Sequence, residues 1–256
     1  NHYCSDKMPI FLESLNLLEW HTVCRHLSTF AVTPQGRQKC KSFDLPLEIS
    51  QSQELLCQTL EMGSLDTSLN GGISFQGVHD LENILLTCSK SGVSAGEDLL
   101  KVAETLRSSR RLRKLIFDQS LRPRLSELLI NISTLPDLQQ LLEFGLEEGG
   151  RIADRASPKL SELRRHRNSL RLERKVILQG IIGKYSGLLQ DNIVSERYGR
   201  PVLAMKAGTS DQFKGIVHDS SASGNTIYVE PKGIISIGNR LSQIDSEISN
   251  EERRLL

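Results

Sequence analysis

Residues 218–223 carry side chains that could do hydrolytic chemistry, but not with the spacing that the chemistry needs. His218 and Asp219 precede a serine-rich run. Together, the histidine, the aspartate and a serine would supply a base, an acid and a nucleophile. Neighbouring residues on a strand point to opposite faces, so adjacency does not bring the three groups together. The residue types favour a turn in which Asp219 and the serines satisfy backbone amides.

A second segment, Gly183-Lys184-Tyr185-Ser186, hints at a loop that binds nucleotide phosphates. The complete motif has a glycine five positions before its second glycine and Ser or Thr directly after the lysine. Leu178 and Tyr185 stand at those positions. We therefore expect no cofactor in these residues.

Metal-binding and membrane signals do not occur in the sequence. The five cysteines form no C-x-x-C pair, and no spacing of Cys with the six His matches a zinc site. No cluster of Asp and Glu suggests a two-metal nuclease centre. No apolar run approaches the roughly 20 residues that cross a bilayer. We expect no catalytic residue, no metal and no membrane partner, and reduced cysteines predict an intracellular location.

Positive charge is concentrated in two segments, although the net charge is only +1. Residues 151–184 contain ten basic and three acidic side chains, and residues 107–124 contain seven basic and one acidic. Such segregation is the electrostatic footprint of a polyanionic partner, because phosphate contacts carry affinity without sequence preference. The alternative stays open that these are solvated helix faces, or that the arginines pack on apolar surface or pair with acids elsewhere.

The spacing of apolar residues predicts helices through the first part of the chain. Thr33-Pro34 fits a helix N-cap followed by proline at the first helical position. Residues 50–53 and 94–97 each fit a capping box. The fold class predicted for the whole chain is therefore mainly α.

The last hundred residues predict a helix, a small sheet and a second helix. Residues from Ser157-Pro158 to about Gln190 keep a narrow apolar stripe at roughly heptad spacing, which suits a helix paired with one partner. A second stripe continues to the last residue, so we expect more protein to follow. Between the stripes, residues 198–231 contain three short apolar runs separated by turns, which predict three strands. So small a sheet needs support, and an antiparallel helix pair with the sheet at its tip supplies it.

The segment from Arg197 to Pro231, RYGRPVLAMKAGTSDQFKGIVHDSSASGNTIYVEP, resembles a stretch of the second MutS family, here MutS-two. That stretch reads approximately R-x-G-R-x-V-x-P-V-K…G-x-V-H-D-x-S-x-S-G-x-T-x-[FY]-[IV]-E-P. The segments LEWHTVCRHLSTFAVTPQGR, ISFQGVHDLENIL and DRASPKLSELRR are also similar to family segments, so that the likeness covers essentially the whole chain. Ala204 departs from a frequent proline, and the loop at 208–211 also varies.

The resemblance implies a MutS-like organisation without the mismatch-reading N-terminal domains. It divides the chain into a helical core (1–157), an ascending lever helix (158–195), a small β clamp (196–233) and a truncated descending lever helix (234–256). It also implies an ATPase domain outside this chain, which holds ATP and Mg, and in many members a nuclease module. The chain itself is therefore expected not to be an enzyme. The full-length protein is expected to be a DNA-dependent ATPase and, where the module is present, an endonuclease.

The function that the resemblance implies is a clamp and lever acting on DNA. The family is linked to branched or recombination-intermediate DNA and to suppression of recombination, and a homodimer would open and close two clamps around a duplex or junction. Two alternatives stay open: engagement of rRNA in the rescue of stalled ribosomes, and a purely structural dimerisation connector. Trp20 after Leu18-Glu19 is similar to plant members. A plant organelle, chloroplast or mitochondrion, is therefore expected, or otherwise a bacterial-type cytoplasm.

The predicted nucleic-acid contacts lie on the clamp segment. They are its basic side chains and the polar residues of the loop, where backbone amides can also meet phosphate. For the loop, a purely structural turn and a contact between two clamps remain alternatives. The candidate residues are Arg197, Arg200, Lys206, Lys214, Ser221, Ser223, Asn225 and Lys232.

Overall fold

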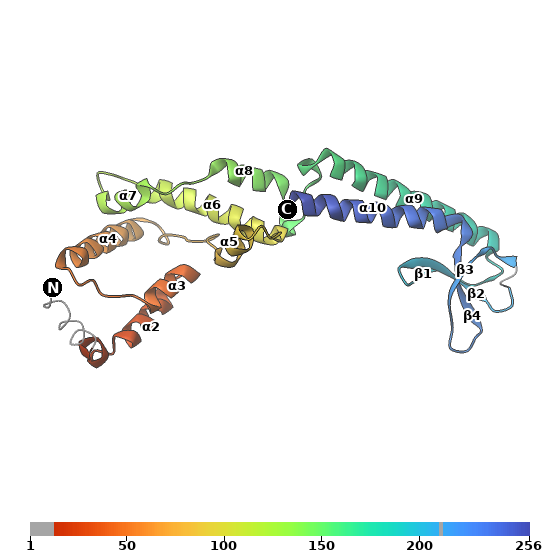
Figure 1. Ribbon diagram of the computed structural model, residues 1–256, viewed down its shortest axis with the longest axis horizontal. Helices are drawn as coiled ribbons and strands as arrows, with labels where there is room; N and C mark the ends of the chain where they lie inside the picture. The colour runs from red at the N-terminus through yellow and green to blue at the C-terminus, as the bar shows by residue number, and fades with distance from the viewer. Residues whose placement is uncertain (1–12, 210–211) are drawn as a thin grey trace. The chain divides into compact units, whose positions relative to one another are not determined.

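The computed structural model describes residues 13–209 and 212–256. Residues 210 and 211, half of the loop that departs from the family pattern, lie outside them. The chain divides into two compact units, Asn1–Arg151 and Ile152–Leu256. Helices make up most of the regular structure in the described part, which confirms the prediction of a mainly α protein (Figure 1). No helix in this part is both long enough and apolar enough to cross a membrane.

The first unit is built from helices that pack through α4, α6 and α7. Its main buried cluster joins Leu65 of α4, Ile116 of α6 and Leu125 of α7. The elements are α2 (Trp20–Phe30), α3 (Pro34–Lys41), α4 (Ile49–Ser68), α5 (Glu82–Ser89), α6 (Gly96–Ile116), α7 (Pro123–Ile130), α8 (Pro136–Gly145) and the 3₁₀ turn η1 (Glu148–Gly150).

One of the three predicted helix starts in this unit is confirmed. Thr33 caps α3, and its hydroxyl accepts a hydrogen bond from the amide of Gly36 at 3.1 Å. The predicted capping boxes at residues 50–53 and 94–97 are wrong, because α4 and α6 begin without a side-chain cap. Ser94 lies before the first turn of α6, where its hydroxyl contacts the thiol of Cys88 at 3.3 Å.

The second unit contains an antiparallel helix pair, α9 (Pro158–Tyr185) and α10 (Lys232–Leu255), preceded by the 3₁₀ turn η2 (Asp154–Ala156) (Figure 1). The helix α9 starts at the predicted Ser157-Pro158, where Ser157 is the N-cap and also donates to the carboxylate of Glu251 at 2.8 Å, near the end of α10. The start of α10 lies against Ile177 and Ile181, in the last turns of α9. The predicted apolar stripe of α10 is buried along this interface at Ile237, Leu241, Ile244 and Ile248.

The sheet has four antiparallel strands in the order β1-β2-β4-β3, one strand more than predicted. The strands are β1 (Leu189–Arg197), β2 (Arg200–Lys206), β3 (Gly215–Ser220) and β4 (Thr226–Pro231). The unexpected strand is β1, because α9 ends at Tyr185 whereas the helix was expected to continue to residue 195. Only Leu189 of β1 is buried, so the strand lacks the apolar alternation that would reveal it.

The sheet is supported by the end of α9, as its small size requires. Tyr185 of α9 packs edge-on against Phe213, with ring centroids 5.0 Å apart. Phe213 lies in a buried cluster with Leu203, Met205 and Val229 of the central strands. Packing against α9 therefore supplies the apolar contacts that a sheet of this size cannot make by itself.

Candidate nucleic-acid interface

The N-terminal half of α9 uses its basic side chains to hold the helix pair together. The guanidinium of Arg164 is almost completely buried and donates to the carboxylates of Asp154 and Glu252, the latter at 2.7 Å. Arg167 approaches Asp245 of α10 at 3.4 Å. Because these groups are matched by acids of the same unit, they are not available to an external polyanion.

Glu251 of α10 stabilises the same end of the α9/α10 helix pair. Its buried carboxylate accepts hydrogen bonds from Arg254 at 2.7 Å and from Ser157 at 2.8 Å, and Lys159 lies 3.5 Å away. The hydrogen bonds from Arg254 and Ser157, together with the charge of Arg254, lower the pKa of Glu251 to about 2. The carboxylate is therefore ionised wherever the protein is folded near neutral pH.

The C-terminal half of α9 presents its basic side chains differently. Arg171, Arg174 and Lys175 form no ion pair within the described residues, and they border a groove between α9 and the strands β1 and β2. This α9/β1 groove has a volume of about 530 Å³. Its lining residues are Arg171, Arg174, Lys175, Leu178, Gln179, Ile182, Asn192, Val194, Ser195, Glu196 and Pro201.

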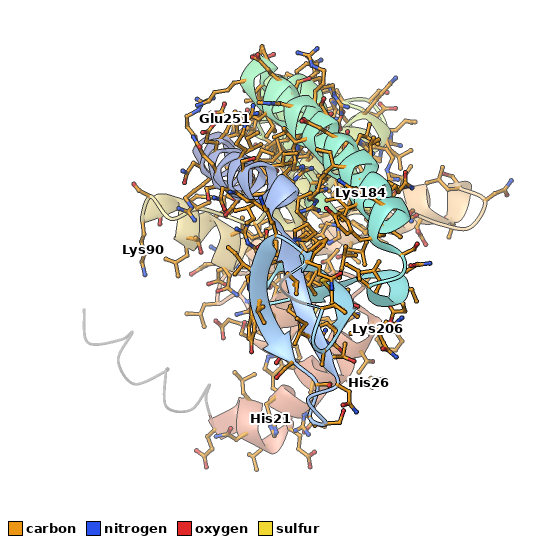
Figure 2. The ribbon with its side chains drawn as sticks, turned by 90° about the vertical axis from the view of Figure 1, so that its right-hand side faces the viewer. His21, His26, Lys90, Lys184, Lys206 and Glu251 are labelled. Carbon is orange, nitrogen blue, oxygen red and sulfur yellow. The ribbon has the colours of Figure 1, made fainter. Side chains whose placement is uncertain are left out.

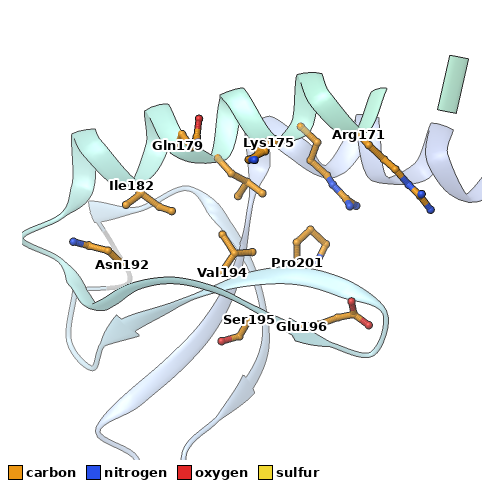
Figure 3. Close-up of a pocket in the computed structure, with 11 residues that line it drawn as sticks. Arg171, Lys175, Gln179, Ile182, Asn192, Val194, Ser195, Glu196 and Pro201 are labelled. Carbon is orange, nitrogen blue, oxygen red and sulfur yellow. The ribbon is translucent and has the colours of Figure 1, made fainter. Parts of the chain in front are cut away.

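The α9/β1 groove combines an apolar surface with a basic border. Figure 3 shows Arg171 and Lys175 extending from α9 above Val194 and Pro201, which belong to β1 and β2. Glu196 is the acidic residue among its lining residues. A groove of this composition suits a chain that alternates charged and flat apolar groups, as a nucleic-acid strand does.

Both predicted arginines of the sheet form ion pairs with acidic residues of the second unit. The Nε atom of Arg197 lies 3.3 Å from a carboxylate oxygen of Asp219, and its guanidinium stacks on the ring of Tyr228 at 4.0 Å. Arg200 lies 3.3 Å from the carboxylate of Glu230 and donates to the side-chain oxygen of Asn239 at 2.7 Å. These contacts give both arginines a structural role, which sequence reasoning did not predict.

Sequence reasoning missed Glu230, the centre of this arrangement. Its side chain is fully buried, and one carboxylate oxygen lies 2.8 Å from the Nε2 atom of His218 and 3.3 Å from Arg200. The absence of a side chain at Gly238 lets α10 approach, since a Cβ there would lie 2.7 Å from Arg200. Glu230 thus links β2, β3 and β4 beside α10. His218 is turned toward Glu230 in this contact, which argues against a catalytic triad with the serines.

The predicted lysines are exposed. Lys206 donates to the carbonyl of Gly187 at 3.1 Å, and Figure 2 shows it on the sheet, near the end of α9 that carries Lys184. Lys214 and Lys232 are neighbours, because the amide of Lys232 donates to the carbonyl of Lys214 at 3.0 Å. Both side chains are exposed and without an ion pair in the described part of the chain. The structure therefore leaves these two lysines available to a ligand.

The predicted loop forms the tight turn between β3 and β4. The hydroxyl of Ser221 accepts a hydrogen bond from the amide of Thr226 at 3.1 Å, and its carbonyl accepts one from the amide of Gly224 at 2.8 Å. Ser223 and Asn225 are exposed. The prediction that loop serines satisfy turn amides is confirmed for Ser221. The exposed tip is accessible to a large ligand.

The basic segment of the first unit is engaged largely in internal contacts. Arg107 pairs with Glu143 at 2.8 Å, and hydrogen bonds from Gln139 and Arg107 lower the pKa of that carboxyl. Four more arginines of the segment make similar contacts. These are Arg110 to the side chain of Gln139, Arg111 to the carbonyls of Ser74 and Gln76, Arg122 to the carbonyl of Ile116, and Arg124 to Glu54.

Fold and site together define a mainly helical protein in which a small sheet rests on a helix pair beside a basic groove. In the part of the chain that the structure describes, no three or more His, Cys, Asp or Glu side chains gather to hold a metal ion.

The sequence is similar to proteins named Endonuclease MutS2. The protein of Synechocystis sp. is 40% identical over 98% of this chain, that of Symbiobacterium thermophilum 33% over 95%, and that of Pelotomaculum thermopropionicum 32% over 95%. The chain spans 31% of the length of each of these relatives. No protein-family model matches it. The chain is therefore homologous to one part of the MutS2 proteins, which confirms the resemblance that residues 197–231 indicated.

Proposed function

We propose that this chain is the nucleic-acid-binding lever and clamp region of a MutS-like ATPase, together with its helical core. In this proposal α9 and α10 are the levers, and the four-stranded sheet is the clamp. The observation that carries the proposal is the α9/β1 groove, where Arg171, Arg174 and Lys175 lack acidic partners among the described residues. The similarity to proteins named endonucleases supports DNA as the polyanion.

The mechanical part of the proposal rests on how both ends of the helix pair are fixed. At one end, Arg164 and Glu251 tie the two helices by charged hydrogen bonds. At the other end, Glu230 and Arg200 hold the sheet beside α10 through Asn239. A displacement of the helices would therefore move the sheet with them, since ion pairs and packed apolar stripes resist local bending.

The remaining activities of the whole protein are part of the same proposal. ATP and Mg would be bound by an ATPase domain outside this chain, and cleavage by a nuclease module would also lie outside it. ATP-driven movement of the levers would open and close two clamps of a homodimer on branched or recombination-intermediate DNA, and so suppress recombination. The protein would act inside the cell, in a plant organelle or in a bacterial-type cytoplasm.

Binding measured across a salt series tests the proposal. Fluorescence anisotropy of labelled duplex, four-way-junction and single-stranded DNA would be recorded between 50 and 200 mM salt, both with this chain and with the intact protein. Each phosphate contact is expected to contribute about 0.9 to the negative slope of log affinity against log salt on duplex DNA. A slope near zero would favour the alternative in which the chain is a purely structural connector. If ribosomes displace the labelled DNA at lower concentrations than unlabelled junction DNA does, the ribosomal alternative is favoured.

A further inference from the structure

Tyr198 has a backbone conformation that its residue type disfavours. It occupies the two-residue turn between β1 and β2 with φ of 52°, and Gly199 follows with φ of 73°. Two successive left-handed residues define the turn type that prefers Asn-Gly, because a bulky side chain at φ > 0 is strained. Strain of this kind at a surface turn calls for an explanation outside folding.

The side chain of Tyr198 makes few stabilising contacts within the protein, since 81% of the residue is exposed. The residues on either side are nevertheless fixed. Arg197 stacks on Tyr228 and pairs with Asp219, while Arg200 is held by Glu230. The strained turn therefore displays an aromatic ring to solvent from a rigid base.

The hairpin that carries Tyr198 also forms one side of the α9/β1 groove. Val194 and Glu196 of β1 and Pro201 of β2 line the groove, and Glu196 and Pro201 pair across the strands beside the turn. A strand lying in the groove with its phosphates on the basic border would have its bases on the apolar side. The exposed ring lies at the end of that hairpin, two residues along the chain from Glu196, which lines the groove.

We propose that Tyr198 is a stacking platform for an unpaired nucleobase of a DNA strand bound in the α9/β1 groove. This inference rests on the proposed function and adds the residue that would recognise an unpaired base in the bound DNA. Aromatic stacking accepts any base, because every base has a flat π-face, but it requires a base that is not enclosed in a duplex. DNA with a gap, flap or branch point should therefore bind more tightly than continuous duplex.

Three substitutions at this position separate stacking from structure. Tyr198→Phe keeps the ring, Tyr198→Asn gives the turn its preferred residue, and Tyr198→Ala removes the ring without that benefit. Tyr198→Asn should raise the thermal midpoint, while its affinity for gapped DNA falls roughly tenfold and its duplex affinity stays unchanged. Ile193→Asn alters an exposed side chain of β1 that does not line the groove and should leave gapped-DNA binding as it is.

Stacking is measured directly by the fluorescence of 2-aminopurine. The probe is a gapped duplex that carries 2-aminopurine as an unpaired base between abasic sites, so that this base is unstacked before the protein binds. Binding should quench its fluorescence with the original protein and with Tyr198→Phe, and should not quench it with Tyr198→Asn or Tyr198→Ala. Equal quenching by all variants, or loss of gap preference in Tyr198→Phe, would overturn the stacking role. If the unsubstituted chain binds no DNA at any salt concentration, the proposed function itself fails.

Discussion

The two arginine-rich segments of this chain have similar excess charge and are used in opposite ways. In residues 107–124, contacts within the first unit engage five of the seven basic side chains. In α9, internal ion pairs involve Arg164 and Arg167 in the first half, whereas Arg171, Arg174 and Lys175 border an open groove. A concentration of positive charge thus indicates a ligand surface only where the fold leaves that charge without acids.

The division within α9 follows the distribution of acids on its neighbours. Its first half faces the part of α10 that contains Asp245, Glu251 and Glu252. Its second half faces the sheet, whose acidic contribution to the groove is Glu196. The same helix is therefore structural at one end and available to a ligand at the other.

Charge reversal in the groove should give the largest effect. The triple change Arg171→Glu, Arg174→Glu and Lys175→Glu is expected to weaken DNA binding about 100-fold or more at low salt, because three phosphate contacts become repulsive. The midpoint of thermal unfolding should stay nearly constant, since these side chains form no internal ion pair among the described residues. Anisotropy and calorimetry measure the two quantities. The matched control is Arg107→Glu with Arg111→Glu, which should lower the unfolding midpoint and leave DNA affinity unchanged.

Arg164→Ala should give the largest loss of stability. It leaves Asp154 and Glu252 without their buried partner, and because both acids are partly exposed the expected cost is about 2–3 kcal/mol. Arg165→Ala removes the adjacent, exposed arginine and should change the free energy of unfolding by less than about 0.5 kcal/mol. Urea unfolding measures both, and equal losses would contradict the structural role of Arg164.

Arg122→Ala tests the basic segment of residues 107–124, and the expected loss of stability is smaller than for Arg164→Ala. Arg122 donates to the carbonyl of Ile116 at 2.7 Å and lies 3.7 Å from Asp118, so its removal should cost about 1–2 kcal/mol. DNA affinity should not change. A loss of affinity at constant stability would assign this segment to the ligand surface as well, and Lys114→Ala, at an exposed position of α6, is the control.

Acid should weaken the helix pair through Glu251. The folded pKa of about 2 lies below the ordinary 4.5, so the unfolded chain binds the proton more readily. The stabilisation is therefore complete above about pH 4.5 and is lost as pH falls toward 2. Unfolding curves of the unsubstituted protein and Glu251→Gln should converge over that range. A difference that stays constant with pH would show that the carboxylate charge contributes nothing.

Local patterns predicted much of this protein correctly. Thr33 and Ser157 cap their helices because a hydroxyl followed by proline fixes the first turn within a few residues. The stripe from Ile237 to Ile248 predicted the pairing of α10, and the block from Arg197 to Pro231 predicted the homology. Each of these signals is contained in a short stretch of sequence.

Strand β1 and the use of each charge were decided by the tertiary structure. Strand β1 escaped prediction because an edge strand with a single buried residue, Leu189, has no apolar alternation. Glu230 pairs with Arg200 beside α10 although the two residues are distant in sequence, and no local pattern predicted this ion pair. A sequence sets the number and type of charges. Only the fold sets which acids come within a few ångströms of them, because ion pairing depends on distance in space and not along the chain.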